Sequence, residues 1–205
     1  MIAAQDALER LREGNRRFVA SISGDEMHLH LAKGVELTQE QQPIAIILGC
    51  SDARVPAEIV FDQGLGELFV IRVAGNVVAP SQVGSVEFAA TRFGTRLVVV
   101  LGHSRCGAVL ATIEELQRPA ENQSLNLRSI VDRVRPSVEG LLRTELKHDL
   151  NALVGNAVRS NVRASVDHLR HGSALLEQLI RHEGLVVVGA EYSLETGIVE
   201  FFDGV

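Results

Sequence analysis

The stretch IAIILGCSDARVP, residues 44–56, decides the fold class of this chain. Its apolar run ends at Gly49, and Cys50, Asp52 and Arg54 then follow at alternate positions. A short apolar run rich in β-branched residues indicates a strand that is buried on both faces, as in a parallel sheet. Three chemically active side chains therefore come directly after the carboxyl end of a buried strand, where open α/β sheets place their ligands.

Similar apolar runs recur along the chain with helical patterns between them. Further strands are predicted at residues 67–73, 96–102 and 185–189, and helices at residues 81–94 and 106–118. This alternation predicts an α/β fold with a mostly parallel central β-sheet flanked by helices.

The remaining segments complete this architecture. Residues 125–183 are predicted to be helical with one interruption near Pro136, and residues 156–170 and 173–182 each form a helix. A turn at residues 195–197 precedes a C-terminal edge strand. Residues 4–20 form an amphipathic N-terminal helix, which packs either on its own core or as an arm across a second subunit. With no repeat or linker in the sequence, residues 1–205 are expected to form a single domain.

Composition excludes several classes of protein. The 205 residues carry a formal net charge of −6 with both signs interspersed, so we expect no nucleic-acid partner. No segment has the length and apolarity of a membrane span or the pattern of a leader peptide, which indicates a cytoplasmic protein without a membrane partner. Two cysteines in a reducing compartment indicate a metal or catalytic site more often than a disulfide.

Two predicted strands end in the same way, one at Cys50 and the other at His103. Since both endings lie on the carboxyl edge of a parallel sheet, the two residues are expected to meet, and Cys106 follows three residues after His103 at the start of a predicted helix. One imidazole and two thiolates suit zinc, with a fourth position left open for catalysis. The alternatives are buried cysteines that act as small apolar side chains, a disulfide, and a purely structural zinc site.

The motifs C-x-D-x-R at residues 50–54 and H-x-x-C at residues 103–106 together resemble those of the β-class carbonic anhydrases, and the resemblance extends over nearly the whole chain. It implies one zinc ion per chain, held by Cys50, His103 and Cys106. The implied substrate is carbon dioxide or bicarbonate, and the implied assembly is a homodimer that often pairs into a homotetramer. Hydrolysis of carbonyl sulfide or carbon disulfide, performed by related proteins with the same ligands, is the alternative activity.

Asp52 and Arg54 are the expected catalytic pair. Zinc lowers the pKa of its bound water and so provides a hydroxide that attacks carbon dioxide. Because two thiolates partly cancel the charge of the metal, neighbouring groups have to compensate. Asp52 can orient the zinc-bound hydroxide, and Arg54 can keep that carboxylate ionised and correctly directed.

The resemblance also implies residues that bind the substrate. Gln41 matches a glutamine that relatives contribute to the pocket of the neighbouring subunit, and Phe69 matches an aromatic residue that lines the pocket. Ala74 and Phe88 stand where some relatives have valine and tyrosine, and Gly107 adjoins Cys106. Core packing explains the apolar members of this set equally well.

Relatives of this family have either an open site or a site closed by the aspartate. Those that close carry a bicarbonate pocket of tryptophan, arginine and tyrosine, and the matching residues here are Ile47, Arg72 and Tyr192. Isoleucine lacks the indole N–H donor, so the resemblance implies an open (type I) site. The histidines at residues 28 and 30 are candidates for a proton shuttle or for adventitious metal binding.

Overall fold

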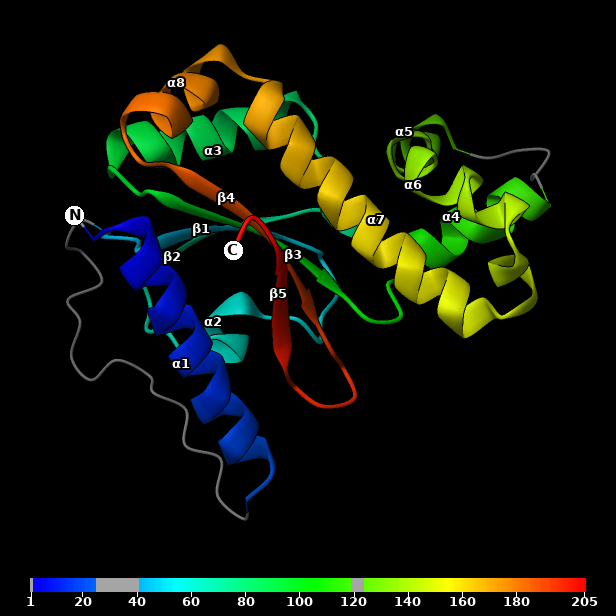
Figure 1. Ribbon diagram of the computed structural model, residues 1–205, viewed down its shortest axis with the longest axis horizontal. Helices are drawn as coiled ribbons and strands as arrows, with labels where there is room; N and C mark the ends of the chain where they lie inside the picture. Colours follow the sequence, from blue (N-terminus) through cyan, green and yellow to red (C-terminus); the bar gives the residue numbers. More distant parts are fainter. Residues whose placement is uncertain (1, 25–40, 119–123) are drawn as a thin grey trace.

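The computed structural model describes residues 2–24, 41–118 and 124–205, which form an α/β fold around a central sheet (Figure 1). In these residues the sheet has the order β2-β1-β3-β4-β5. The first four strands run parallel and the last is antiparallel. Their bounds are β1 Ala45–Gly49, β2 Leu68–Arg72, β3 Leu97–His103, β4 Val186–Tyr192 and β5 Val199–Asp203. The predicted fold class is confirmed.

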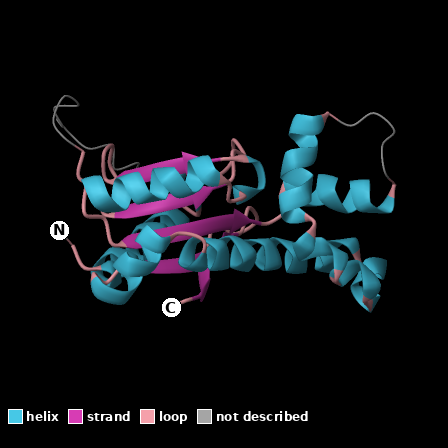
Figure 2. Ribbon diagram, turned by 90° about the horizontal axis from the view of Figure 1, so that it is seen from above, coloured by secondary structure: helices cyan, strands magenta, loops and turns pink. Residues whose placement is uncertain are grey.

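Helices cover both faces of the sheet because its central strands are apolar on both sides (Figures 1 and 2). Helices α1 (Ala4–Ile22) and α2 (Ala57–Val60) pack on the face that includes Ile47. The face that includes Ile46 carries α3 (Pro80–Arg92), α8 (Ala174–His182) and the second half of α7 (Leu150–His171). Alternate residues of one strand therefore enter different cores, as the pleat of a strand requires.

A helical lobe lies beyond the sheet and holds a third apolar core (Figure 2). It consists of α4 (Gly107–Gln117), α5 (Leu125–Val134), α6 (Pro136–Glu139), the first half of α7 and two short 3₁₀ turns, η2 (Leu141–Arg143) and η3 (Glu145–His148). Cys50 and Cys106 belong to the same apolar cluster as Val109, Leu153 and Val158. The lobe thus covers the carboxyl ends of β1 and β3, where the candidate ligands lie.

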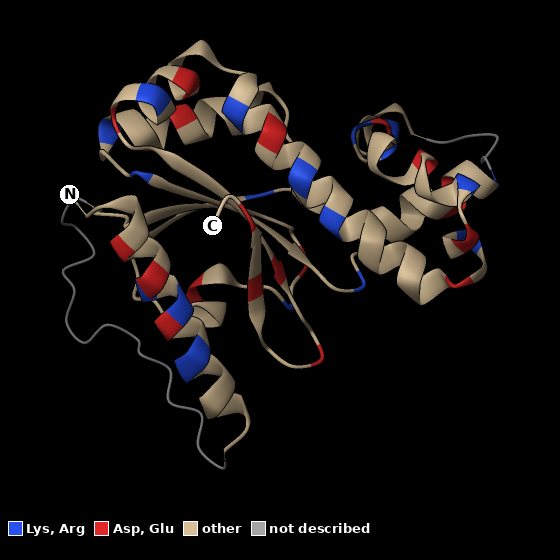
Figure 3. Ribbon diagram, viewed as in Figure 1, with Lys and Arg blue, Asp and Glu red and all other residues tan. Residues whose placement is uncertain are grey.

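Helix α1 packs its apolar face on the core of its own chain. Leu8 and Leu11 are buried there, and the buried side chain of Asn15 bonds to the backbone of both α2 and the turn before β5. Acidic and basic residues both occur along the outer side of this helix (Figure 3), and Arg17 pairs with Asp62 at 2.6 Å. Among the described helices, none combines the length and the apolarity needed to cross a bilayer.

The main departure from the predicted secondary structure lies between residues 140 and 149. The sequence predicts one interruption near Pro136, but Pro136 begins α6 and the chain turns again through η2 and η3 before α7. Polar side chains here form hydrogen bonds with backbone amides and so compete with the hydrogen bonds of a continuous helix. The Thr144 hydroxyl accepts a hydrogen bond from the amide of Leu146, and the Asp149 carboxylate caps α7 through the amide of Ala152. Helix α7 consequently begins six residues before the predicted start at residue 156.

Candidate metal centre

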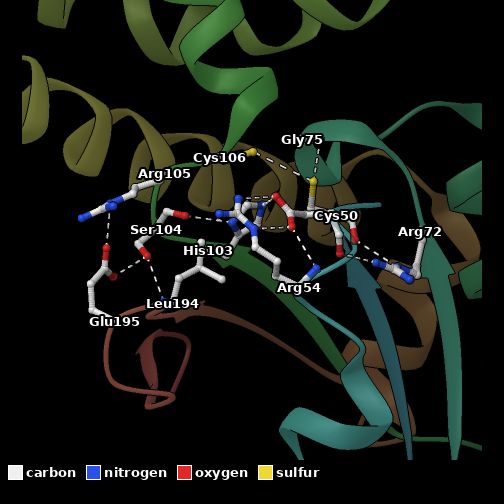
Figure 4. Close-up of polar contacts among 11 residues, drawn as sticks. Cys50, Arg54, Arg72, Gly75, His103, Ser104, Arg105, Cys106, Leu194 and Glu195 are labelled. Atoms are coloured by element: carbon white, nitrogen blue, oxygen red, sulfur yellow. Dashed lines mark hydrogen bonds and ion pairs between the residues drawn. The ribbon is translucent and has the colours of Figure 1, made fainter.

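Two neighbouring parallel strands bring the three candidate ligands together. Cys50 follows β1, His103 ends β3, and Cys106 is the residue immediately before α4. Since Gly49 pairs with Leu101, the two strands end side by side. The ligand atoms of the three residues lie within 4.8 Å of one another, all three residues are buried, and the two sulfurs are 4.0 Å apart (Figure 4).

The charges in this cluster favour a cation. The hydrogen bond with Cys106 lowers the pKa of the Cys50 thiol, and the Gly75 amide, 3.3 Å from Cys50 Sγ, acts in the same direction. The bond with Cys50 and then burial raise the pKa of Cys106. Thiolates on both sulfurs at this buried position therefore require a positive charge beside them.

His103 directs an unpartnered nitrogen into the same cluster. Its Nδ1 lies 2.9 Å from the carbonyl oxygen of Ser104, so the N–H on this nitrogen donates to the backbone. Its Nε2 then carries the lone pair, is buried, and has no hydrogen-bond partner among the described residues. An unpaired buried nitrogen is costly, and metal-binding histidines usually donate their other N–H in this way. The donor set of one imidazole and two sulfurs thus fits a borderline-soft divalent cation.

Asp52 and Arg54 lie beside this cluster and form a bidentate ion pair. Arg54 Nε donates to Asp52 Oδ1 at 2.9 Å, and Arg54 Nη2 donates to Oδ2 at 2.7 Å. These bonds hold the pKa of the Asp52 carboxyl well below its usual range. The Oδ2 atom is also 3.8 Å from His103 Nε2, so an ionised carboxylate oxygen faces the candidate metal position.

Arg72 fixes the backbone of the segment that carries these residues. Its Nε donates to the carbonyl oxygen of Cys50 at 3.1 Å, and its Nη2 donates to the carbonyl oxygen of Asp52 (Figure 4). The sequence pointed to Arg72 only as the counterpart of a bicarbonate-binding arginine. In this structure its donors hold the loop after β1.

Asn161 on α7 also fixes the site, although it is not among the residues predicted from the sequence. Its side-chain N–H donates to the carbonyl oxygen of Gly75 at 2.7 Å, and the amide of the same glycine reaches Cys50 Sγ. Asn161 is 2% exposed. The sequence could have indicated this role, because Asn161 is a polar residue on the apolar face of a predicted helix and such a residue needs a buried hydrogen-bond partner.

The other predicted site residues fall into two groups. Ala74 begins the short turn η1 (Ala74–Asn76) that donates to Cys50, and Gly107 is the first residue of α4, so both adjoin the cluster. Phe69 pairs with Ile46, four residues before Cys50, and packs against Phe88 at a centroid distance of 6.2 Å.

Gln41 is likewise separated from the cluster within one chain. It lies exposed before the amino end of β1, whereas Cys50 follows the carboxyl end. The chain does not bring Gln41, Phe69 and Phe88 to its own cluster. The histidines at positions 28 and 30 lie outside the described residues.

Together these features define an α/β protein that carries a candidate metal centre at the carboxyl edge of its sheet. Comparisons with known proteins then identify the family. A family profile described as carbonic anhydrase matches residues 45–199. The chain is 40% identical over 198 residues to a carbonic anhydrase of Mycolicibacterium smegmatis. The alignment covers 95% of this chain and 91% of the relative.

Solved structures agree with this match. The β-carbonic anhydrase CafA of Aspergillus fumigatus aligns with a TM-score of 0.71 and 25% identity, over 80% of this chain and 77% of that chain. A Coccomyxa β-carbonic anhydrase aligns with a TM-score of 0.69 and 25% identity, over 95% and 86%. The chain belongs to the β-carbonic anhydrase family, whose members are lyases that interconvert carbon dioxide and bicarbonate.

Gly75 supplies a test of the bond to Cys50. Its φ of +69° is left-handed, and an added Cβ would come within 3.0 Å of the Ala108 Cβ. We expect Gly75→Ala to lower the free energy of unfolding by about 1–3 kcal/mol and to weaken metal binding, because the amide moves away from Cys50 Sγ. Urea unfolding and competition with a chelator measure the two effects.

The matched control is Gly155→Ala in α7, where an added Cβ meets no atom within 4 Å. This variant should bind metal like the wild type and gain up to about 1 kcal/mol of stability. Wild-type metal affinity in Gly75→Ala would contradict the role given to the Gly75 amide.

Proposed function

We propose that residues 1–205 act as one catalytic domain that reversibly hydrates carbon dioxide to bicarbonate and a proton, with one zinc ion per chain. The buried cluster of Cys50, His103 and Cys106 carries this proposal. Its donor types suit zinc, and three protein ligands leave the fourth tetrahedral position open to substrate. Membership of the carbonic anhydrase family supports the same reaction.

The residues around the cluster have defined tasks in this mechanism. When bound, zinc supplies a hydroxide nucleophile at neutral pH by lowering the pKa of water. Asp52 Oδ2 accepts a hydrogen bond from the nucleophile and so directs its lone pair at the carbon of the substrate. Arg54 keeps Asp52 ionised by its two hydrogen bonds. Ala74 offers an apolar surface, and the missing side chain of Gly107 leaves room beside Cys106 for a small linear substrate.

We further propose that the site rests in the open form, with Asp52 bound to Arg54. Three hydrogen bonds from Arg54, two from the side chain and one from the backbone amide, support this form. The contacts of Arg72 also favour it. Two of its nitrogens donate to the backbone carbonyls of Cys50 and Asp52 and are therefore not free to bind bicarbonate.

A homodimer is the proposed functional unit, and two such dimers can pair into a tetramer. Gln41, Phe69 and Phe88 are the expected substrate-binding residues that one chain keeps away from its own cluster. Among the described strands β2 is an edge strand, and the Phe88 side chain beside it is 53% exposed. A second copy that packs on this edge would cover the exposed ring and receive these three side chains at its own site.

The main test combines metal content with activity. The wild type should contain one zinc ion per chain and hydrate carbon dioxide in stopped-flow assays. Cys106→Ser and His103→Ala should lose metal and activity together, by about 100-fold or more in activity, because each removes one of three ligands. His182→Ala, at the end of α8, is the control and should change neither quantity.

Two outcomes would contradict this assignment. Full activity of metal-free protein would exclude the zinc mechanism. Negligible hydration of carbon dioxide with rapid hydrolysis of carbonyl sulfide or carbon disulfide would reassign the substrate.

Arg54→Ala tests the catalytic pair. Without its partner, Asp52 loses its orientation and is free to turn onto the metal. Zinc should stay bound, while kcat/KM for carbon dioxide should fall about 100-fold or more. Arg128→Ala, which removes an exposed ion pair with Asp132 on α5, should leave activity unchanged. A wild-type crystal structure above pH 8 with Asp52 about 2.0–2.2 Å from zinc would overturn the open form.

Phe88→Glu tests the dimer. A buried charge at the proposed interface should shift the protein to a monomer in sedimentation equilibrium, with zinc retained and most activity lost. Leu125→Glu, at a site that is 80% exposed on α5, is the control. Gln41→Ala should keep the dimer and the zinc but weaken catalysis. A wild-type monomer with full activity at the assay concentration would rule out the dimer as the functional unit.

A further inference from the structure

One carboxylate outside the metal centre contacts both residues that separate two of the candidate ligands. Ser104 and Arg105 lie between His103 and Cys106, and Glu195 lies in the turn between β4 and β5. The Ser104 hydroxyl donates to Glu195 Oε2 at 2.7 Å, and Arg105 Nε pairs with Glu195 Oε1 at 2.8 Å. Figure 4 shows Glu195 bridging these two side chains.

The loop that Glu195 holds determines the direction of His103. The carbonyl oxygen of Ser104 accepts the Nδ1–H of His103, so its position sets where Nε2 points. Arg105 has a φ of +55°, which is a left-handed conformation that a non-glycine residue keeps only when its surroundings hold it. A change at either residue would therefore move a candidate ligand.

The turn that carries Glu195 is itself anchored. The buried side chain of Asn15 donates to the carbonyl oxygen of Gly197 at 2.9 Å and accepts from the amide of Val199 at 2.8 Å. The amide of Leu194 donates to the Ser104 hydroxyl at 3.0 Å. The carboxylate thus connects the ligand loop to a fixed part of the fold.

We propose that Glu195 is a positioning residue that prepares His103 and Cys106 for metal binding, acting through Ser104 and Arg105. This inference rests on the metal centre of the proposed function. Glu195 touches neither ligand and would not touch the substrate. It raises metal affinity because it increases the fraction of molecules in which both ligands already have the binding geometry.

Global stability is a poor measure of this role. The Glu195 and Arg105 side chains are 44% and 74% exposed, and an exposed ion pair contributes little to folding. A loop that loses its anchor stays folded but visits more conformations, and the metal then binds only the competent fraction. The effect should therefore appear in metal affinity and in the ligand geometry.

The experiment compares the wild type, Glu195→Ala, Glu195→Gln and Ser104→Ala as full-length proteins. Metal is removed with a chelator, and Co²⁺ is then titrated in competition with a chelator of known affinity. Glu195→Ala should bind Co²⁺ about tenfold more weakly, with a changed d–d absorption band. Glu195→Gln should be intermediate, since an amide oxygen still accepts from Ser104 but carries no charge for Arg105.

Ser104→Ala combined with Glu195→Ala tests the route of the effect. The double variant should lose less affinity than the product of the two single losses, because both changes break the same contact. Glu200→Ala is the matched control. It removes a glutamate that is 59% exposed on the adjoining strand β5 and pairs with Arg159, away from the ligand loop, and should leave affinity and spectrum unchanged.

The possible outcomes distinguish the role of Glu195 from the existence of the metal centre. Affinity within twofold of the wild type and an unchanged spectrum in both Glu195 variants would overturn the inference, as would a lower melting temperature of the metal-free protein without any loss of affinity. Strictly multiplicative losses would exclude action through Ser104. If Glu195→Ala does not fold, Glu195→Gln decides. If the wild type binds no Co²⁺, the proposed metal centre fails too, whereas tight binding by wild type and variants alike removes only the role of Glu195.

Discussion

The parallel pairing of β1 with β3 is the constraint on which the rest of this structure depends. Because the two strands run side by side in the same direction, Cys50 and His103 emerge next to each other although their residue numbers differ by 53. The turn after His103 is so short that Cys106 returns to the same point before α4 begins. A shift in the pairing of these strands would separate the ligands without any change in the residues themselves.

A buried cluster of this kind also requires hydrogen-bond partners or a positive charge for its polar atoms. Two sulfurs and an imidazole nitrogen in an apolar core cannot all be satisfied by the protein, as the unpartnered Nε2 of His103 shows. Backbone groups supply some of these partners, such as the Gly75 amide, which donates to Cys50 Sγ. A divalent cation would satisfy what remains. Binding of such a cation would therefore be coupled to completion of this core.

The sequence was sufficient for the strands and the candidate ligands because these depend on local patterns. Buried parallel strands are short apolar runs, and cysteine and histidine at their ends stand out. The bonding partners of Asn161, Arg72 and Glu195 were not predictable, since each bonds to groups that are distant in sequence and become neighbours only in the folded chain. The two 3₁₀ turns before α7 were missed for a different reason. Their apolar spacing is compatible with a helix, and only the capping by Thr144 and Asp149 decides against it.

The contacts around the candidate ligands and the side chains proposed to bind the substrate differ in origin. Arg72 and Gly75 bond to Cys50, and Glu195 bonds to the loop that carries His103 and Cys106, all within one protomer. Gln41 and Phe88 reach a cluster only if a second copy supplies it, as in the proposed dimer. A two-fold symmetric pair would then contain two equivalent sites, each with ligands from one protomer and substrate contacts from the other. Metal affinity should consequently be independent of protein concentration, whereas catalytic activity per chain should fall on dilution below the dissociation constant of the dimer.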